Sequence, residues 1–316
     1  MSSGVRIGVD LGGTKIEIAA FDAAGVERLR QRAATPAGDY AATLRAIAGL
    51  VADAERRLGC SASVGVCTPG AVSPATGLLK NSNSVCLNDR PLLQDLQRSL
   101  KRPVRIANDA DCFALSEATD GAARGAASVF GVIIGTGTGG GLVIHGRLLS
   151  GPNAIAGEWG HNPLPWAGKD ERPGPPCYCG KRGCIETWLS GPGLARDYRE
   201  AGGEALDADR IATLDIGGDS AASACLARYV DRLARALASV INIVDPEVIV
   251  LGGGLGNIQR LYRDVPKRWQ RYVFSDHVDT RLVRPLHGDA SGVRGAAWLW
   301  PAASRPAVGS GSESTG

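Results

Sequence analysis

Apolar and polar residues alternate along this chain in blocks that predict strands joined to helices. Two apolar runs, 5–13 and 15–22, flank a glycine turn and predict a hairpin, and residues 128–146 repeat that pattern. Residues 39–58 and 221–244 carry apolar side chains at helical spacing. Shorter strands are predicted at 63–70, 104–109 and 246–254, and shorter helices at 91–100, 109–123 and 291–300. This alternation predicts an α/β fold, and the hairpins predict that its sheets are mixed.

The bulk composition is that of a globular protein with room for two cores. The chain has 316 residues, more than a single core usually organises. Its net charge of +3 is too small to indicate a nucleic-acid or membrane partner. The first residues lack a signal-peptide pattern, and no apolar run is long enough to span a bilayer, so we expect a cytoplasmic protein. Residues 304–316 are polar and of low complexity, which predicts a disordered tail.

Three glycine-rich turns each follow an apolar strand and are candidates for binding phosphate. Backbone N–H groups bind phosphate oxygens well, and glycine lets the main chain approach them closely. An aspartate at a strand end also suits Mg²⁺, which takes few carboxylates and keeps several waters. The candidate residues are Asp10, Gly12, Gly13, Thr14 and Lys15 in the first turn, Thr136, Gly137, Thr138 and Gly139 in the second, and Gly252, Gly253 and Gly254 in the third. One such turn is often a plain hairpin, and neither common nucleotide motif is present, but three turns together favour a nucleotide.

The segment "ANDAD" places Asn108 and Asp109 where a strand ends and a helix begins. Asp109 or Asp111 could simply cap that helix. Alternatively, Asp109 is a general base that takes a proton from a substrate hydroxyl, while Asn108 binds a neighbouring hydroxyl. Other polar loops suit a polyol, although the same residues are common in surface loops. These further candidates are Gly70, Asn83, Glu158, His161 and Glu186.

Three cysteines crowd into "CYCGKRGC", as Cys177, Cys179 and Cys184. A Cys-x-x-Cys redox motif is absent, so the alternatives are a metal site or free thiols. A tetrahedral structural site needs a fourth ligand, and His161 is the histidine nearby, sixteen residues before Cys177. One nitrogen and three sulfurs predict structural Zn²⁺.

Several of these motifs together resemble the ROK family (repressors, open reading frames, kinases). The matching strings are "DLGGTK", "NDA", "IIGTGTGGGLVIHGRLLSGPNAIAGEWGH", "CYCGKRGCIE" and "DPEVIVLGGG", in order over nearly the whole chain. The resemblance implies an actin-like ATPase (ribonuclease H-like) fold with two domains around a cleft. We expect residues 1–107 with about 288–303 in a smaller domain, and 108–287 in a larger domain that carries the cysteines.

The resemblance also implies a function: transfer of the γ-phosphoryl group of ATP, as its Mg²⁺ complex, to a hexose hydroxyl by a homodimer. Asp109 would be the base, and Asp10 with the glycine turns would hold phosphates and metal. Asn108, Glu158, His161 and Glu186 would contact the sugar, with Gly70 and Asn83 nearby. The set His161, Cys177, Cys179 and Cys184 matches the family's zinc site. His161 is then expected to give one ring nitrogen to zinc and the other to a sugar hydroxyl.

The strings around the motifs look most similar to bacterial fructokinases (mannofructokinases). We therefore expect fructose to be phosphorylated to fructose 6-phosphate. N-acetylglucosamine, N-acetylmannosamine, mannose and glucose are the alternative substrates. A sugar-sensing regulator that lacks its DNA-binding domain is the non-enzymatic alternative, and a zinc-knuckle nucleic-acid binder has no basic and aromatic pattern to support it.

Overall fold

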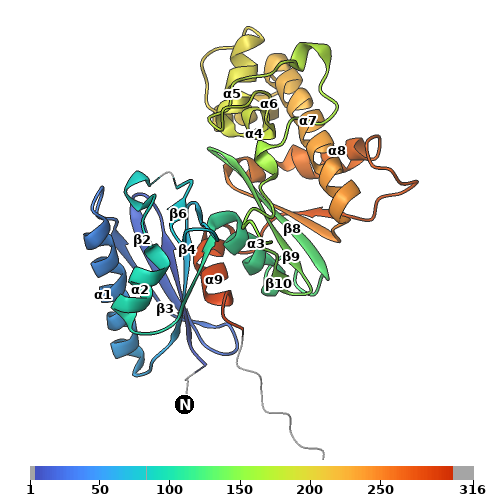
Figure 1. The fold of residues 1–316 in the computed structure, drawn as a ribbon. Helices are drawn as coiled ribbons and strands as arrows, with labels where there is room; N and C mark the ends of the chain where they lie inside the picture. Colours follow the sequence, from blue (N-terminus) through green and yellow to red (C-terminus); the bar gives the residue numbers. More distant parts are fainter. Residues whose placement is uncertain (1–3, 83, 302–316) are drawn as a thin grey trace, which may run out of the picture.

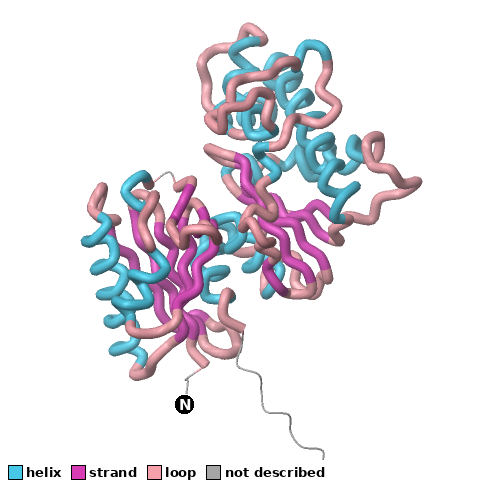
Figure 2. The backbone as a smooth tube through the Cα atoms, viewed as in Figure 1, coloured by secondary structure: helices cyan, strands magenta, loops and turns pink. Residues whose placement is uncertain are grey.

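The computed structural model describes residues 4–82 and 84–301. Figure 1 shows two α/β halves side by side, and Figure 2 shows that each half contains its own sheet. The predicted division of the chain at residues 107 and 288 stays a prediction, and the predicted tail, 304–316, lies outside the described residues. Within the described part, no helix is both long and apolar enough to cross a bilayer.

The first sheet has the strand order β3-β2-β1-β4-β7 and is mixed, as predicted. Its strands are β1 (Arg6–Leu11), β2 (Lys15–Phe21), β3 (Glu27–Ala34), β4 (Ser63–Thr68) and β7 (Val104–Asn108). β1 and β2 form the predicted hairpin, whereas β1, β4 and β7 run parallel. Two helices, α1 (Tyr40–Leu58) and α2 (Leu92–Leu100), bury their apolar residues against this sheet.

The second sheet has the order β10-β9-β8-β11-β12. Its strands are β8 (Ser128–Ile134), β9 (Thr138–Ile144), β10 (Arg147–Leu148), β11 (Val248–Gly252) and β12 (Arg281–Val283). β8 and β9 form the second predicted hairpin, and β8 runs parallel to β11. The long helix α7 (Ser220–Val244) shares the largest apolar core with this sheet, and its residues 229–241 are buried on nearly every side.

Smaller elements complete the fold around these sheets. They are β5 (Ala71–Val72), β6 (Leu79–Lys80), α4 (Ile185–Leu189), α5 (Gly191–Glu200), α6 (Ala208–Ile216), α8 (Gln259–Trp269) and the 3₁₀ turns η1 (Val85–Leu87), η2 (Trp159–His161), η3 (Lys169–Glu171), η4 (Gly254–Asn257) and η5 (Gly288–Ala290).

Two helices, α3 (Asp109–Thr119) and α9 (Ser291–Trp298), join the halves through a shared apolar core. Glycines let α9 lie very close to the first sheet: a Cβ on Gly8 would fall 1.8 Å from the Val293 carbonyl oxygen. On the other side of α9, a Cβ on Gly295 would fall 1.8 Å from the Cys112 carbonyl oxygen of α3. Since no substituent fits in either contact, α9 packs closely against β1 on one side and α3 on the other.

The start of α3 corrects one expectation about its cap. Neither Asp109 nor Asp111 caps the helix; Asn108 does, with its side-chain oxygen accepting from the Asp111 N–H at 2.6 Å. Asn108 is the last residue of β7 and its backbone is extended, which is the conformation an N-cap requires. Asp109 therefore occupies the first helical position, where the helix dipole favours a negative charge.

Candidate active site and metal centre

The carboxyl ends of three parallel strands bring candidate residues to one edge of the first sheet. Asp10 on β1 pairs in register with Cys67 on β4, and Thr68 on β4 pairs with Asn108 on β7. Neighbouring strands lie about 4.8 Å apart, so Asp10 and Asp109 stand about two strand spacings from one another. The buried side chain of Cys67 lies close to the Asp10 carboxylate, and its influence lowers the pKa of Asp10.

Burial makes these carboxylates reluctant to ionise. Desolvation raises the pKa of Asp10 to about 6, and the nearby charges of Glu17 and Asp109 act in the same direction. Desolvation also raises the pKa of Asp109, although a hydrogen bond from the Ala110 N–H opposes it. Protein atoms therefore surround much of the Asp109 carboxylate. The residue nevertheless remains accessible to solvent, and so to a substrate.

Asp111 belongs to the same acidic group, although the sequence suggested only a capping role for it. Burial, followed by the charges of Glu158 and Asp109, raises the pKa of Asp111 to about 7. Its Oδ1 is buried and has no hydrogen-bond partner among the described residues. An unpaired buried oxygen costs free energy, so this edge is suited to receive a donor or a cation.

The second and third glycine turns lie together at the carboxyl ends of β8 and β11. Gly253 has a φ of +79°, and a Cβ there would fall 2.4 Å from the Ile134 carbonyl oxygen. A Cβ on Gly252 would instead strike the Phe113 ring at 2.6 Å, so packing against α3 requires that glycine. The second turn is also held by α5, since the Gly191 N–H at the start of that helix donates to the Gly135 carbonyl at 2.7 Å.

Glu186, at the start of α4, contacts the second turn directly. The Thr138 N–H donates to Glu186 Oε2 at 2.9 Å, and a Cβ on Gly137 would fall 2.8 Å from the same oxygen. The Thr138 hydroxyl is buried without a partner among the described residues. The anion held by this turn in the structure is thus the Glu186 carboxylate, beside an unpaired hydroxyl, and phosphate binding by the turn stays a prediction. Thr136 and Gly139 lie in the same turn, the first exposed and the second against Ala110.

The first glycine turn closes the β1–β2 hairpin. Its Gly12 N–H donates to the Lys15 carbonyl at 3.0 Å, and Gly13, Thr14 and Lys15 are exposed. The exposed Lys15 ammonium lies 3.5 Å from the buried Glu17 carboxylate. Since Arg30 and Arg32 also pair with Glu17, this carboxylate keeps partners if Lys15 turns to a phosphate. Gly254, in the third turn, is likewise exposed with open space around its Cα.

The candidate sugar residues lie on loops that reach the same acidic group. Charges of His161, Asp109 and Glu186 all act on Glu158, whose pKa is raised mainly by desolvation. Trp159 anchors the Glu158 turn, because its buried indole N–H donates to the Gly139 carbonyl at 3.0 Å.

Gly70 lies in the turn between β4 and β5. It has a φ of +81°, and a Cβ there would fall 2.3 Å from the Lys80 carbonyl oxygen, so no other residue fits without a shift of the 80–82 segment. Asn83, the remaining sugar candidate, lies outside the described residues.

The structure brings the four predicted metal ligands together. The ligand atoms of His161, Cys177, Cys179 and Cys184 all lie within 4.8 Å of one another. Cys179 and Cys184 have their sulfurs 3.7 Å apart, and the Cys177 sulfur lies 3.5 Å from His161 Nδ1. With Zn–S near 2.3 Å and Zn–N near 2.0–2.1 Å, a zinc tetrahedron has edges of about 3.8 Å and about 3.6 Å. The donor set therefore fits Zn²⁺ in both chemistry and size.

One contact of His161 differs from the sequence-based expectation. Its Nε2 lies 2.8 Å from the hydroxyl of Tyr178, the residue between the first two cysteines. The nitrogen expected to bind a sugar hydroxyl thus already has a partner. No periodicity or motif spacing singles out Tyr178 in the sequence.

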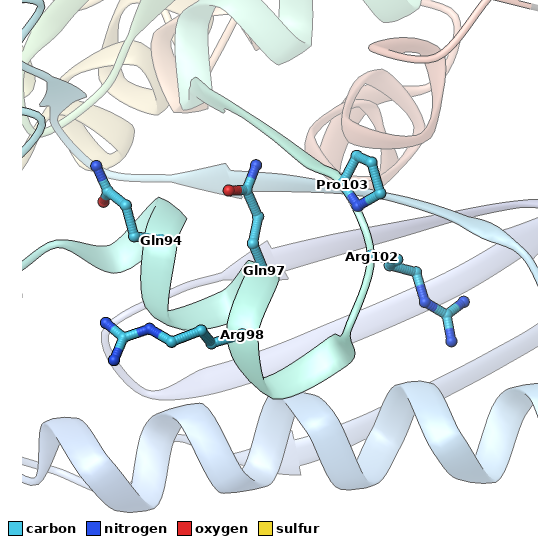
Figure 3. A pocket seen from close by; sticks show the side chains of 5 residues that line it. All are labelled: Gln94, Gln97, Arg98, Arg102 and Pro103. Carbon is cyan, nitrogen blue, oxygen red and sulfur yellow. The ribbon is translucent and has the colours of Figure 1, made fainter.

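A separate pocket of about 460 Å³ lies on α2, away from all of these residues. Figure 3 shows its lining, which is Gln94, Gln97, Arg98, Arg102 and Pro103. Both arginines already have partners, Arg98 with Asp95 and Arg102 with Glu55. This pocket contains no carboxylate and none of the candidate residues, so it does not belong to the site.

Comparison with known proteins gives a family and close relatives. A model of the ROK family matches residues 6–303. An N-acetyl-D-glucosamine kinase of Photobacterium profundum is 42% identical over 296 residues, which cover 92% of this chain and 98% of that protein. The N-acetyl-D-glucosamine kinase of Vibrio cholerae serotype O1 has the same identity and coverage.

Solved structures share the fold over the same extent. The ROK hexokinase from Thermus thermophilus has a TM-score of 0.83 and 32% identity, covering 93% of this chain and 97% of that chain. A ROK family glucokinase from Streptomyces griseus, solved with glucose and AMPPNP, has a TM-score of 0.72 and 25% identity, with 93% and 98% covered. These structures confirm the predicted actin-like ATPase fold, with two domains built on mixed sheets.

Proposed function

Since this chain belongs to the ROK family, we propose that it is an ATP-dependent kinase that phosphorylates a hexose, with N-acetyl-D-glucosamine as the first candidate. The position of Asp109 carries the proposal. It starts a helix at the carboxyl edge of parallel strands, and its charge acts on Asp10 on one side and Glu158 on the other. An accessible carboxylate between a phosphate-type turn and a group of polar loops suits a transfer from nucleotide to polyol.

The three glycine turns would hold the nucleotide phosphates. The unpaired Thr138 hydroxyl and the exposed Gly254 and Thr14 offer donors and close backbone approach. Mg²⁺, when bound with the nucleotide, neutralises charge on the phosphates, and Asp10 is placed to hold it through water. The Streptomyces griseus glucokinase complex with AMPPNP, an ATP analogue, supports ATP as the donor.

Asp109 would act as the general base on the reacting sugar hydroxyl, which we take to be the 6-hydroxyl. Its carboxylate takes the hydroxyl proton while the sugar oxygen bonds to the γ-phosphorus, and the bond from that phosphorus to the β-phosphate oxygen breaks to release ADP. Desolvation raises the pKa of Asp109, which makes its carboxylate a stronger base than an aspartate with the usual pKa. Asn108 keeps the helix start in place, because its side chain is the N-cap.

Zinc would have a structural role beside the sugar. All four ligand positions are taken by His161 and the three cysteines, so no open position remains for the metal to act on a substrate. It would tie the turn that carries Glu158 to the helix start that carries Glu186. The metal thereby fixes two candidate sugar contacts without taking part in the transfer.

We rank N-acetyl-D-glucosamine before fructose for one reason. The fructose expectation rests on short strings around the motifs, whereas relatives 42% identical over 92% of the chain are named N-acetyl-D-glucosamine kinases. A coupled assay of ADP release across N-acetylglucosamine, N-acetylmannosamine, glucose, mannose and fructose tests the proposal. The highest kcat/KM is expected for N-acetylglucosamine; a higher value for fructose would reverse the ranking, and no ADP release with any sugar would refute the kinase.

A further inference from the structure

Tyr178 is an exposed aromatic residue whose hydroxyl contacts a residue of the candidate sugar site. Its side chain lies between two metal-ligand cysteines and is 81% exposed. Its hydroxyl lies 2.8 Å from His161 Nε2, and its ring meets the His161 ring edge-on, at 90° with centroids 5.0 Å apart. So little of the ring is buried that swinging it into solvent costs mainly this one hydrogen bond and one ring contact.

The chemistry of His161 makes that hydrogen bond exclusive. Its Nδ1 faces the Cys177 sulfur at 3.5 Å, within the cluster of metal ligands. When Nδ1 binds a metal, the ring proton is on Nε2, which then has a single hydrogen to donate. In this structure the Tyr178 oxygen is placed to accept that hydrogen. A sugar hydroxyl can accept it only if Tyr178 moves away.

The surroundings of the Tyr178 hydroxyl are those of the candidate sugar site. Its hydrogen-bond partner, His161, is itself a candidate sugar contact and ends the short turn that follows Glu158, another candidate. The tyrosine hydroxyl thus lies where a sugar hydroxyl would have to enter.

We propose that Tyr178 is a specificity-determining gate: its hydroxyl holds His161 Nε2 until a sugar that presents an acceptor hydroxyl at that point displaces it. The proposal rests on the proposed function, since it concerns the same sugar site. A sugar that lacks the hydroxyl gains nothing to offset the displaced tyrosine. The gate therefore selects for one hydroxyl of the substrate, rather than for its overall size.

The test is sugar binding to zinc-loaded, nucleotide-free protein, measured by calorimetry with N-acetylglucosamine. Tyr178→Phe keeps the ring and removes the competing hydroxyl, so Kd is expected to fall roughly 2- to 12-fold, the range given by one net hydrogen bond. Tyr272→Phe is the matched control, because it removes a hydroxyl that bonds Asp231 at 3.2 Å away from the site, and its Kd is expected to match the unsubstituted protein. Zinc content, measured by mass spectrometry, should stay at one per chain in both variants.

A series of mono-deoxy N-acetylglucosamine analogues locates the selected hydroxyl. Tyr178→Phe should lower the Kd of every analogue except the one that lacks the hydroxyl bound by His161. An unchanged Kd in Tyr178→Phe would overturn the gate. A higher Kd at unchanged zinc content would also overturn it, because Tyr178 would then be a direct sugar contact. Loss of zinc with weaker binding would reduce Tyr178 to a support for the metal ligand, which also overturns it. If the unsubstituted protein phosphorylates the sugar and Tyr178→Phe shows no gain, only the gate fails; if no sugar binds or reacts, the proposed function fails with it.

Discussion

Glu117 joins α3 to the start of α9, and its substitution should destabilise the protein strongly. The side chain is fully buried, and both of its oxygens accept hydrogen bonds. Oε1 accepts from the His287 N–H at 3.0 Å and the Ser291 hydroxyl at 2.8 Å, and Oε2 accepts from the Ala122 and Leu286 N–H groups, both at 2.9 Å. This one carboxylate therefore connects segments about 170 residues apart in the sequence.

The cost of Glu117→Gln can be worked out from these four contacts. The amide keeps one accepting oxygen but turns an NH₂ group toward two former donors. The cheaper orientation points the NH₂ at Ser291, whose hydroxyl can rotate to accept, and leaves the His287 N–H unpaired. One unpaired buried N–H and three bonds that lose their charge assistance together amount to about 2–4 kcal/mol.

Urea denaturation followed by tryptophan fluorescence measures this loss, since Trp298 lies in the core that α3 and α9 share. Glu247→Gln is the matched control: Glu247 is exposed and accepts from only the Ala127 N–H among the side-chain contacts described, so less than about 0.5 kcal/mol is expected. A loss below about 1 kcal/mol in Glu117→Gln would refute the reasoning that this carboxylate secures the two helices.

Three further predictions concern the site. Asp111→Asn should raise the melting temperature more at about pH 8 than at about pH 5, measured with EDTA present. Folding raises the pKa of Asp111 from 3.8 to about 7, so its destabilising effect grows as pH rises between these values and is constant above them; equal shifts would contradict this. Gly292→Ala should lower kcat at least about 10-fold, because the new Cβ would lie 2.8 Å from Asp10 Oδ2 and displace that carboxylate. Circular dichroism should show an unchanged fold, and a normal kcat would show that the position of Asp10 does not matter. Cys184→Ser should abolish the proposed zinc binding and lower the melting temperature, whereas Cys60→Ser, outside the cluster, should leave zinc content and melting temperature unchanged. Zinc retained in Cys184→Ser would remove Cys184 from the ligand set.

Periodicity was enough to predict the main elements of this fold. The helix predicted at 39–58 spans Tyr40–Leu58 in the structure, where Asp39 is its cap, and both glycine hairpins and the long helix predicted at 221–244 match the structure closely. Each of these elements has a local signal: regular apolar spacing, or apolar runs that end in glycine. The cap of α3 was predicted wrongly, because Asn108, Asp109 and Asp111 are all good caps, and only the backbone angle where β7 ends selects Asn108.

The sequence predicts those parts of the candidate site whose residues lie close together along the chain. The cysteines lie within eight positions of one another, and His161 is a nearby histidine, so their meeting in space followed from the sequence. Glu117 and Tyr178 were missed for different reasons. Glu117 has donors about 170 residues away that no local pattern reveals, and Tyr178 is a single exposed aromatic whose partner is set only by the folded loop.

The central claim, that Asp109 takes the proton from the sugar hydroxyl, is tested most directly by Asp109→Asn. The substituted side chain can still accept from the Ala110 N–H, now 2.9 Å from the Asp109 oxygen, and Asn108 still caps the helix, so the fold and the sugar site should stay intact. Asp170→Asn, on the exposed η3 turn, is the control. The account predicts that kcat for N-acetylglucosamine, or for whichever sugar the panel selects, falls about 10²- to 10⁴-fold in Asp109→Asn while the sugar Kd stays within about twofold. A kcat within tenfold of the unsubstituted enzyme, at unchanged sugar Kd, would contradict it.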